Sequence, residues 1–194
     1  MIDQPPVPST FAALLAGMHA SLSPGQLAPA IPLAVLRFDD QDLAVPYRVY
    51  YDAAKLWSLV DRCGEPERSL ALCLGSRHWD GHVREACVRR LLPTRERSVI
   101  PFVVCLLGEY VIEIIDLVAE AFDALDVDAL ADFARANPAF MATTRSRATS
   151  YWNERFRRRF PDRLTYPALS MLAEIDRLAE ACAAGTTQRV VQKL

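Results

Sequence analysis

From Asp52 onward, apolar residues recur at the three- and four-residue steps of amphipathic helices, and turn residues divide this pattern into segments. Three of the segments follow an N-cap residue, Asp52, Asp80 and either Asp126 or Asp128, since a short acidic side chain accepts hydrogen bonds from the free amides of a first turn. The predicted helices span residues 53–62, 70–77, 82–92, 98–107, 109–125, about 128–137, 138–160 and 167–184. The pattern therefore predicts an all-α fold.

Residues 1–50 differ from the rest because they hold seven of the thirteen prolines. Each proline removes a backbone donor and disfavours helix just before it. Only residues 9–21 have a helical pattern here, and residues 31–38 and 47–51 are expected to be extended and apolar enough to lie against the helices. The sequence thus predicts a proline-rich N-terminal arm (1–50), a single helical domain (51–184) and a mobile tail (185–194).

The helical region contains an internal repeat. Arg68-Ser69-Leu70 aligns with Arg97-Ser98-Val99, 29 residues further on, and Asp80 then falls on Glu109. A fixed period near 30 residues is typical of a solenoid, because one helical hairpin cannot bury its apolar face until the next one stacks on it.

Residues 70–92 combine an apolar first helix, a turn that carries Asp80, and a second helix that begins with Val83-Arg84. This combination resembles a HEAT repeat. The second unit departs from the pattern, with Ile112-Glu113 in place of Val-Arg. The resemblance covers about residues 68–125 and implies α-α hairpins in a right-handed solenoid or a compact helical array. It implies a binding surface more often than an enzyme.

Acidic residues cluster on the helix predicted at 109–125. Eight acidic residues and no basic one lie between Glu109 and Asp132. Five of them follow helical steps that place them on one stripe, which we name the acidic ridge: Glu109, Glu113, Asp116, Glu120 and Asp123. One interpretation is the solvated edge of an amphipathic helix. The other is a docking surface for a basic partner protein, because like charges on neighbouring turns repel.

The opposite charge dominates residues 145–163, where seven arginines accompany only Glu154 and Asp162. One stripe of this segment, the arginine stripe, consists of Arg147, Tyr151, Arg155 and Arg158. It fits nucleic-acid binding, with arginines on phosphates and Tyr151 available to stack on a base. It also fits pairing with the acidic ridge of the same chain, or plain solvation. The formal net charge of −2 disfavours a dedicated nucleic-acid-binding protein.

Signals of catalysis or metal binding are sparse. Cys73, His78, His82 and Cys87 lack the short paired spacing of a structural zinc site, so packing is the preferred interpretation and neither a metal nor a cofactor is predicted. No glycine-rich phosphate loop, Gly-x-Ser-x-Gly or His-Glu-x-x-His motif occurs, and no catalytic residue is predicted. An acid–base role for Asp80 and His82 is a minor alternative.

The cellular compartment is inferred from the cysteines and the N-terminus. Five irregularly spaced cysteines are typical of free thiols in a reducing compartment. No basic residue precedes the short apolar run at 11–15, and no apolar stretch reaches membrane-spanning length. We therefore expect a cytoplasmic protein that does not contact a membrane.

The sequence thus predicts a non-enzymatic adaptor, or a regulator of the bacterial immunity type, that binds a basic partner protein through the acidic ridge. The alternative is a nucleic-acid-associated protein that uses the arginine-rich segment 145–163. A third hypothesis is an enzyme whose site is assembled by the fold between repeats and leaves no local motif. The oligomeric state stays open.

Overall fold

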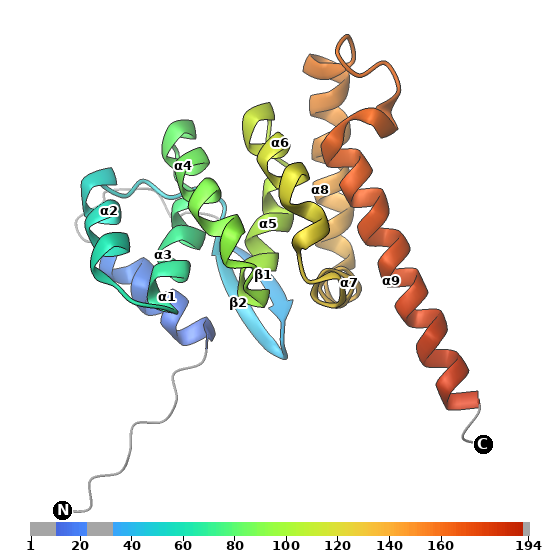
Figure 1. Cartoon of the computed structure of the whole chain (residues 1–194), viewed down its shortest axis with the longest axis horizontal. Coiled ribbons are helices and arrows are strands. Elements are labelled where there is room, and N and C mark those ends of the chain that lie inside the picture. Colours follow the sequence, from blue (N-terminus) through green and yellow to red (C-terminus); the bar gives the residue numbers. More distant parts are fainter. Residues whose placement is uncertain (1–10, 23–32, 192–194) are drawn as a thin grey trace, which may run out of the picture.

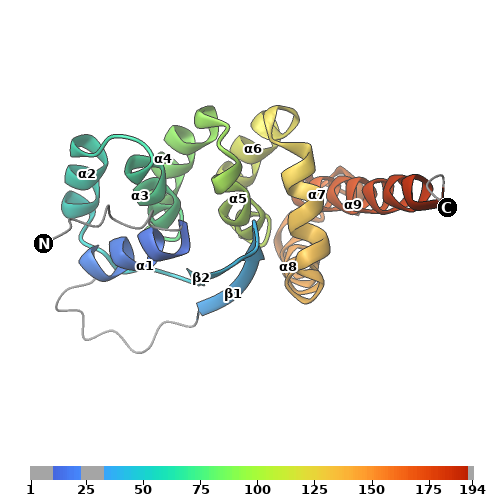
Figure 2. The same cartoon turned by 90° about the horizontal axis from the view of Figure 1, so that it is seen from below.

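The structure, a computed structural model, describes residues 11–22 and 33–191. Helix makes up 72% of it, and the sheet within the described residues has two strands. The prediction of an all-α fold is therefore confirmed. Figure 1 shows helices α2 to α9 following one another along the long axis of the molecule, and Figure 2 shows α1 and the two strands together on one side of this array.

The main elements are α1 (Phe11–Leu22), β1 (Leu33–Phe38), β2 (Gln41–Pro46), α2 (Ala53–Arg62), α3 (Glu67–Gly75), α4 (Gly81–Leu91), α5 (Ile100–Leu106), α6 (Ile112–Ala121), α7 (Val127–Ala136), α8 (Pro138–Tyr151) and α9 (Pro167–Val191). Short turns of other helix types join them: η1 (Leu92–Thr94), η2 (Arg97–Val99), η3 (Phe122–Ala124), η4 (Trp152–Phe156) and η5 (Arg163–Thr165). Helices that follow each other in sequence pack together, α2 on α3, α3 on α4, and α5 on α6.

The predicted N-caps are confirmed. The Asp52 carboxylate accepts from the backbone N–H of Lys55 at 2.9 Å, and that of Asp80 accepts from His82 at 2.9 Å. Of the two candidates before α7, it is Asp126 that caps, accepting from Ala129 at 2.9 Å. These local signals place the starts of α2, α4 and α7 within about one residue of the prediction.

Several predicted helix boundaries are wrong. The helix expected at 70–77 is α3, which begins earlier, at Glu67, and ends at Gly75. The helix expected at 109–125 begins only at Ile112, because residues 108–110 form a turn and Val111 is extended. The helix expected to reach residue 160 ends at Tyr151 and continues as the single wide turn of η4. In contrast, α9 continues past residue 184 to Val191.

The segment before α2 contains a β-hairpin. β1 and β2 pair antiparallel from Leu33 opposite Pro46 to Phe38 opposite Gln41. The two-residue connection, Asp39 and Asp40, has positive φ angles of 46° and 62°, as hairpin turns of this length require. The extended segment predicted at 31–38 is confirmed from residue 33 onward, whereas the second strand precedes the segment predicted at 47–51.

The hairpin belongs to the hydrophobic core. Leu36, Phe38, Leu43 and Val45 are buried against the helices. The chain then attaches to the turn before α4 through Val49, whose N–H donates to the Arg77 carbonyl at 2.9 Å and whose carbonyl accepts from the Trp79 N–H at 2.9 Å. Residues that the composition grouped with an irregular arm therefore help to stabilise the helical body.

The contact between α3 and α4 is especially close. Gly75 at the end of α3 faces Cys87 of α4, and a β-carbon at position 75 would lie 2.4 Å from the Cys87 sulfur. Leu91, further along α4, is fully buried, as the repeat alignment predicted. Tight helix packing of this kind leaves no space for a larger residue.

Candidate functional site

The acidic ridge exists in part. Glu113, Glu120 and Asp123 are exposed, and none of them forms an ion pair within the described part of the chain. Asp116 is half-buried, and its carboxylate lies 3.5 Å from a guanidinium nitrogen of Arg159. One member of the ridge therefore pairs with the arginine-rich segment of the same chain.

Glu109 does not belong to the ridge, and its placement there was wrong. It lies in the turn before α6 and is 2% exposed. The step of four residues from Glu109 to Glu113 does not place the two side chains on one helix face, because the helix begins only after residue 109.

Glu109 is instead the centre of a buried ion cluster. The two nitrogens at the end of the Arg48 side chain donate to its two oxygens, each at 2.7 Å. Arg77 approaches one oxygen at 3.3 Å, and Arg84 lies 3.7 Å from the other. Three guanidinium groups thus surround one carboxylate, which leaves an excess of positive charge.

The cluster changes the proton affinity of its members. Burial by itself would raise the pKa of Glu109, but the hydrogen bonds from Arg48 and the charges of Arg77 and Arg84 outweigh it and lower that pKa. Burial lowers the pKa of Arg84, against the attraction of Glu109. Two buried nitrogens of Arg84, Nε and Nη2, also have no hydrogen-bond partner among the described residues. Arg84 is therefore the least well satisfied member of the cluster.

Sequence reasoning missed this cluster. Its members lie after β2, at the end of α3, in α4 and in the turn before α6, so their proximity is a product of the fold. The one available signal is that Glu109 stands between Leu106-Leu107-Gly108 and Tyr110-Val111, where a lone carboxylate among apolar residues requires a partner if it is buried.

Most of the arginine stripe gathers around tyrosine rings. The guanidinium carbon of Arg147 lies 4.8 Å from the ring centre of Tyr47, and that of Arg155 lies 5.6 Å from the ring centre of Tyr110. Tyr151 packs on Tyr110 with ring centres 5.9 Å apart. Cation–π contacts of this type hold arginines without carboxylate partners. Arg158 lies beyond η4 and is exposed, outside this group.

Burial gives His78 and the nearby cysteines structural roles. His78 is 2% exposed, with one ring nitrogen bonded to the Tyr51 carbonyl at 2.9 Å and the other accepting from the Asp80 N–H at 3.1 Å. Burial raises the pKa of Cys87 to about 12 and that of Cys73 well above its ordinary value. Both thiols stay protonated near neutral pH and are poor nucleophiles.

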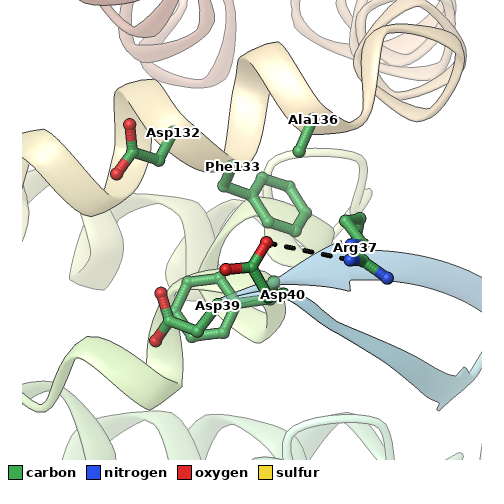
Figure 3. A pocket seen from close by; sticks show the side chains of 7 residues that line it. Arg37, Asp39, Asp40, Asp132, Phe133 and Ala136 are labelled. Atoms are coloured by element: carbon green, nitrogen blue, oxygen red, sulfur yellow. Dashed lines mark ion pairs between the residues drawn. The ribbon is translucent and has the colours of Figure 1, made fainter.

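A hollow of about 220 Å³ lies between the tip of the hairpin and α7 (Figure 3). Ion pairs hold its two sides together. Arg37 pairs with Asp40 at 3.7 Å on the hairpin, and Arg97 contacts Asp39 and Asp132 at 3.1 Å each. These contacts give this hollow a structural role, which is to fasten the hairpin to α7.

Asn137 reinforces the same junction. Its side-chain oxygen accepts from the Arg37 N–H at 2.8 Å, and its side-chain nitrogen donates to the Arg37 carbonyl at 2.7 Å. The amide therefore pairs with the edge of β1 as a neighbouring strand would.

A groove of about 490 Å³ adjoins the acidic ridge. Phe122 and Asp123 of η3 form one side, and Leu164 and Met171 contribute apolar side chains from η5 and α9. Leu164 is 55% exposed, so part of its apolar side chain is open to solvent at this groove. The groove thus combines apolar surface with the acidic end of the ridge.

Among the residues described, none of the helices combines the length and the apolar character needed to cross a membrane. Comparison with known proteins gives no match, since no protein-family model, no curated protein and no solved structure is significantly similar to the chain.

Proposed function

We propose that this chain is a non-enzymatic binding protein, an adaptor or a regulator of the immunity type, that engages a basic partner protein. The observation that carries the proposal is the exposure of Glu113, Glu120 and Asp123 without an ion pair inside the described part of the chain. Neighbouring like charges repel, and a partner of opposite charge would relieve this repulsion on binding.

The groove beside the ridge supports the same proposal. A partner segment with lysine or arginine next to one large apolar side chain would place its charges near Asp123 and Glu120, and its apolar side chain between Phe122 and Leu164. Apolar anchors of this kind supply most of the affinity in protein interfaces, and surrounding charges supply specificity and association rate.

HEAT-like stacking of the hairpins is part of the proposal. Its support is the 29-residue offset, which relates the pair α3–α4 to the pair α5–α6, and the direct packing within each pair. Arrays of this type mostly present binding surfaces. A cytoplasmic location also belongs to the proposal and rests on the unpaired, buried thiols of Cys73 and Cys87.

The test compares two triple variants of equal charge. The ridge variant combines Glu113→Gln, Glu120→Gln and Asp123→Asn, and the control combines Glu67→Gln, Glu154→Gln and Glu180→Gln at positions away from α6 and η3. The wild type and the control should capture the same proteins from a lysate of the native cells at low salt and release them as the salt concentration rises. The ridge variant should not capture these proteins. Equal capture by both variants would refute the proposal.

A second candidate function is nucleic-acid binding, which the packing of Arg147 and Arg155 on tyrosine rings favours. Tyr47 and Tyr110 are about half-exposed, so a base could stack beside an arginine that binds phosphate. Binding of a fluorescent mixed-sequence single strand that weakens with salt and is lost in Arg147→Gln/Arg155→Gln would favour this function. Its absence near physiological salt would exclude it.

A further inference from the structure

A second cavity lies between the hairpin and α8, with a volume of about 650 Å³. It exceeds the hollow at the hairpin tip, which has a volume of about 220 Å³. Binding sites for small organic molecules range from about 300 to 1,000 Å³. The cavity therefore has the size of a ligand site.

One part of the cavity wall is apolar. Val45 and Pro46 contribute to it from β2, and Ala139 and Phe140 contribute from the first turn of α8. A molecule that extends along this wall gains free energy by removing apolar surface from water. The wall fits a hydrocarbon or aromatic body.

The rest of the wall is strongly positive. Arg147 lines the cavity and has no carboxylate partner in the described part of the chain. Arg77 also lines it and belongs to the ion cluster, in which three guanidinium groups share the single carboxylate of Glu109. Burial raises the pKa of the Cys105 thiol on the cavity wall, and the charges of Arg77 and Arg147 oppose this rise, so both arginines act on the same part of the cavity.

The donors that remain for a ligand are on α8. Arg77 is already committed, since it donates to the carbonyls of Pro46 and Tyr47 and to Glu109. Thr144 lines the cavity with little exposed surface, and its hydroxyl is available to a molecule bound there. Its neighbour Thr143 instead donates to the carbonyl four residues earlier, at 3.0 Å.

A hydroxyl on a cavity wall can donate a hydrogen bond to a carboxylate oxygen of a bound molecule. Thr144 and Arg147 are three residues apart on one helix, so they lie on the same face one turn apart. The helix therefore presents a hydroxyl beside a guanidinium group that packs on the Tyr47 ring and has no carboxylate partner among the described residues.

We propose that this cavity binds an amphipathic organic carboxylate. The carboxylate is held by the planar fork of Arg147 and by the Thr144 hydroxyl, Arg77 adds a fixed positive charge, and the apolar body lies against Val45 and Phe140. An arginine fork matches the two oxygens of a carboxylate, and the positive charge of Arg147 balances its single negative charge. This inference is independent of the acidic ridge, which lies on α6 on the opposite side of the array (Figure 2).

Isothermal titration calorimetry with four probes tests the proposal on the wild-type protein. 2-Naphthoate carries both features, its carboxamide lacks the charge, acetate lacks the apolar body, and 2-naphthyl phosphate changes the head group. The naphthoate should bind at least about tenfold more tightly than the carboxamide and than acetate. Equal binding of naphthoate and carboxamide, or no binding of naphthoate up to its solubility limit, would overturn the proposal. Tighter binding of the phosphate than of the carboxylate would also overturn it.

Three variants locate the site. Arg147→Gln and Thr144→Val should each weaken naphthoate binding, the first by at least about tenfold, whereas the exposed control Arg158→Gln should leave it unchanged. Ala139→Trp should fill the cavity and prevent binding. Circular dichroism and thermal unfolding confirm that each variant is folded. Unchanged affinity in folded Arg147→Gln or Ala139→Trp would show that naphthoate binds elsewhere and would overturn the proposal.

Discussion

Replacement of Glu109 by glutamine is the most direct test of the buried ion cluster. The change keeps the shape of the side chain but removes the carboxylate that, among the described residues, pairs with Arg48, Arg77 and Arg84. Loss of one partner from a buried ion pair typically costs about 3–5 kcal/mol, because the remaining charge stays buried without compensation. Whole domains are stable by only about 5–15 kcal/mol, so this is a large fraction of the total.

The magnitude follows from the individual contacts. Glu109 accepts two hydrogen bonds at 2.7 Å from Arg48, and a hydrogen bond to a charged group contributes about 1.5–3 kcal/mol. Glutamine retains one acceptor oxygen and places an NH₂ group, a donor, opposite an arginine. We therefore expect a loss of about 3–5 kcal/mol in urea unfolding near neutral pH. The matched control Glu113→Gln, at an exposed position, should change stability by less than about 0.5 kcal/mol.

The pH dependence gives an independent check. The pKa of Glu109 is lowered on folding from its ordinary value of 4.5. The ionised carboxylate therefore stabilises the fold above that ordinary value, and this contribution is lost as the pH falls through the lower folded-state pKa. The difference in stability between wild type and Glu109→Gln should shrink as the pH decreases below about 5. A loss below about 1 kcal/mol, or a constant difference across this range, would refute the cluster as a stabilising unit.

Three further changes test other parts of the structure by urea unfolding. Leu91→Ala should cost about 2–5 kcal/mol because Leu91 is fully buried, and a loss below about 0.5 kcal/mol would contradict that burial. Gly75→Ala should cost about 1–3 kcal/mol because the new β-carbon would meet the Cys87 sulfur. The second change Cys87→Ala should recover part of this loss, and no recovery would refute the steric explanation. Arg84→Met should lower the free energy of unfolding less than Arg48→Gln does, because two buried nitrogens of Arg84 have no partner among the described residues whereas Arg48 bonds directly to Glu109. A larger loss in Arg84→Met than in Arg48→Gln would contradict this ranking.

The parts of the fold that were predicted from the sequence depend on local chemistry. Asp52 and Asp80 cap helices through bonds to amides two or three residues away, so the sequence contains all the information needed. The hairpin was missed because its turn uses two aspartates with positive φ and no glycine, and because Pro46 directly after Val45 suggested an irregular arm. Its stability comes from burial against helices far along the chain, which a local pattern does not contain.

The candidate site was less predictable because a shift of three residues in the start of a helix decides whether Glu109 lies on the surface or inside the molecule. Glu109 fits the spacing of the ridge, but α6 begins three residues later, and the side chain lies inside the molecule. A step of four residues implies a shared face only within a continuous helix. The cavity between the hairpin and α8 could not be inferred at all, since its walls come from segments that are distant in sequence.

The position of Glu109 also determines how charge is distributed over the molecule. Its burial leaves the acidic ridge with one carboxylate fewer than the sequence predicted, and that carboxylate compensates only part of the positive charge of Arg48, Arg77 and Arg84. The remaining carboxylates of the ridge are on α6 and η3, whereas Arg147 of α8 lines the cavity beside the hairpin. Surfaces of opposite sign select different ligands, and they respond separately to substitution. The ridge variant should therefore lose the basic partner but still bind naphthoate, and Arg147→Gln should lose naphthoate binding but still capture the partner. Loss of both functions in either variant would mean that one surface serves both.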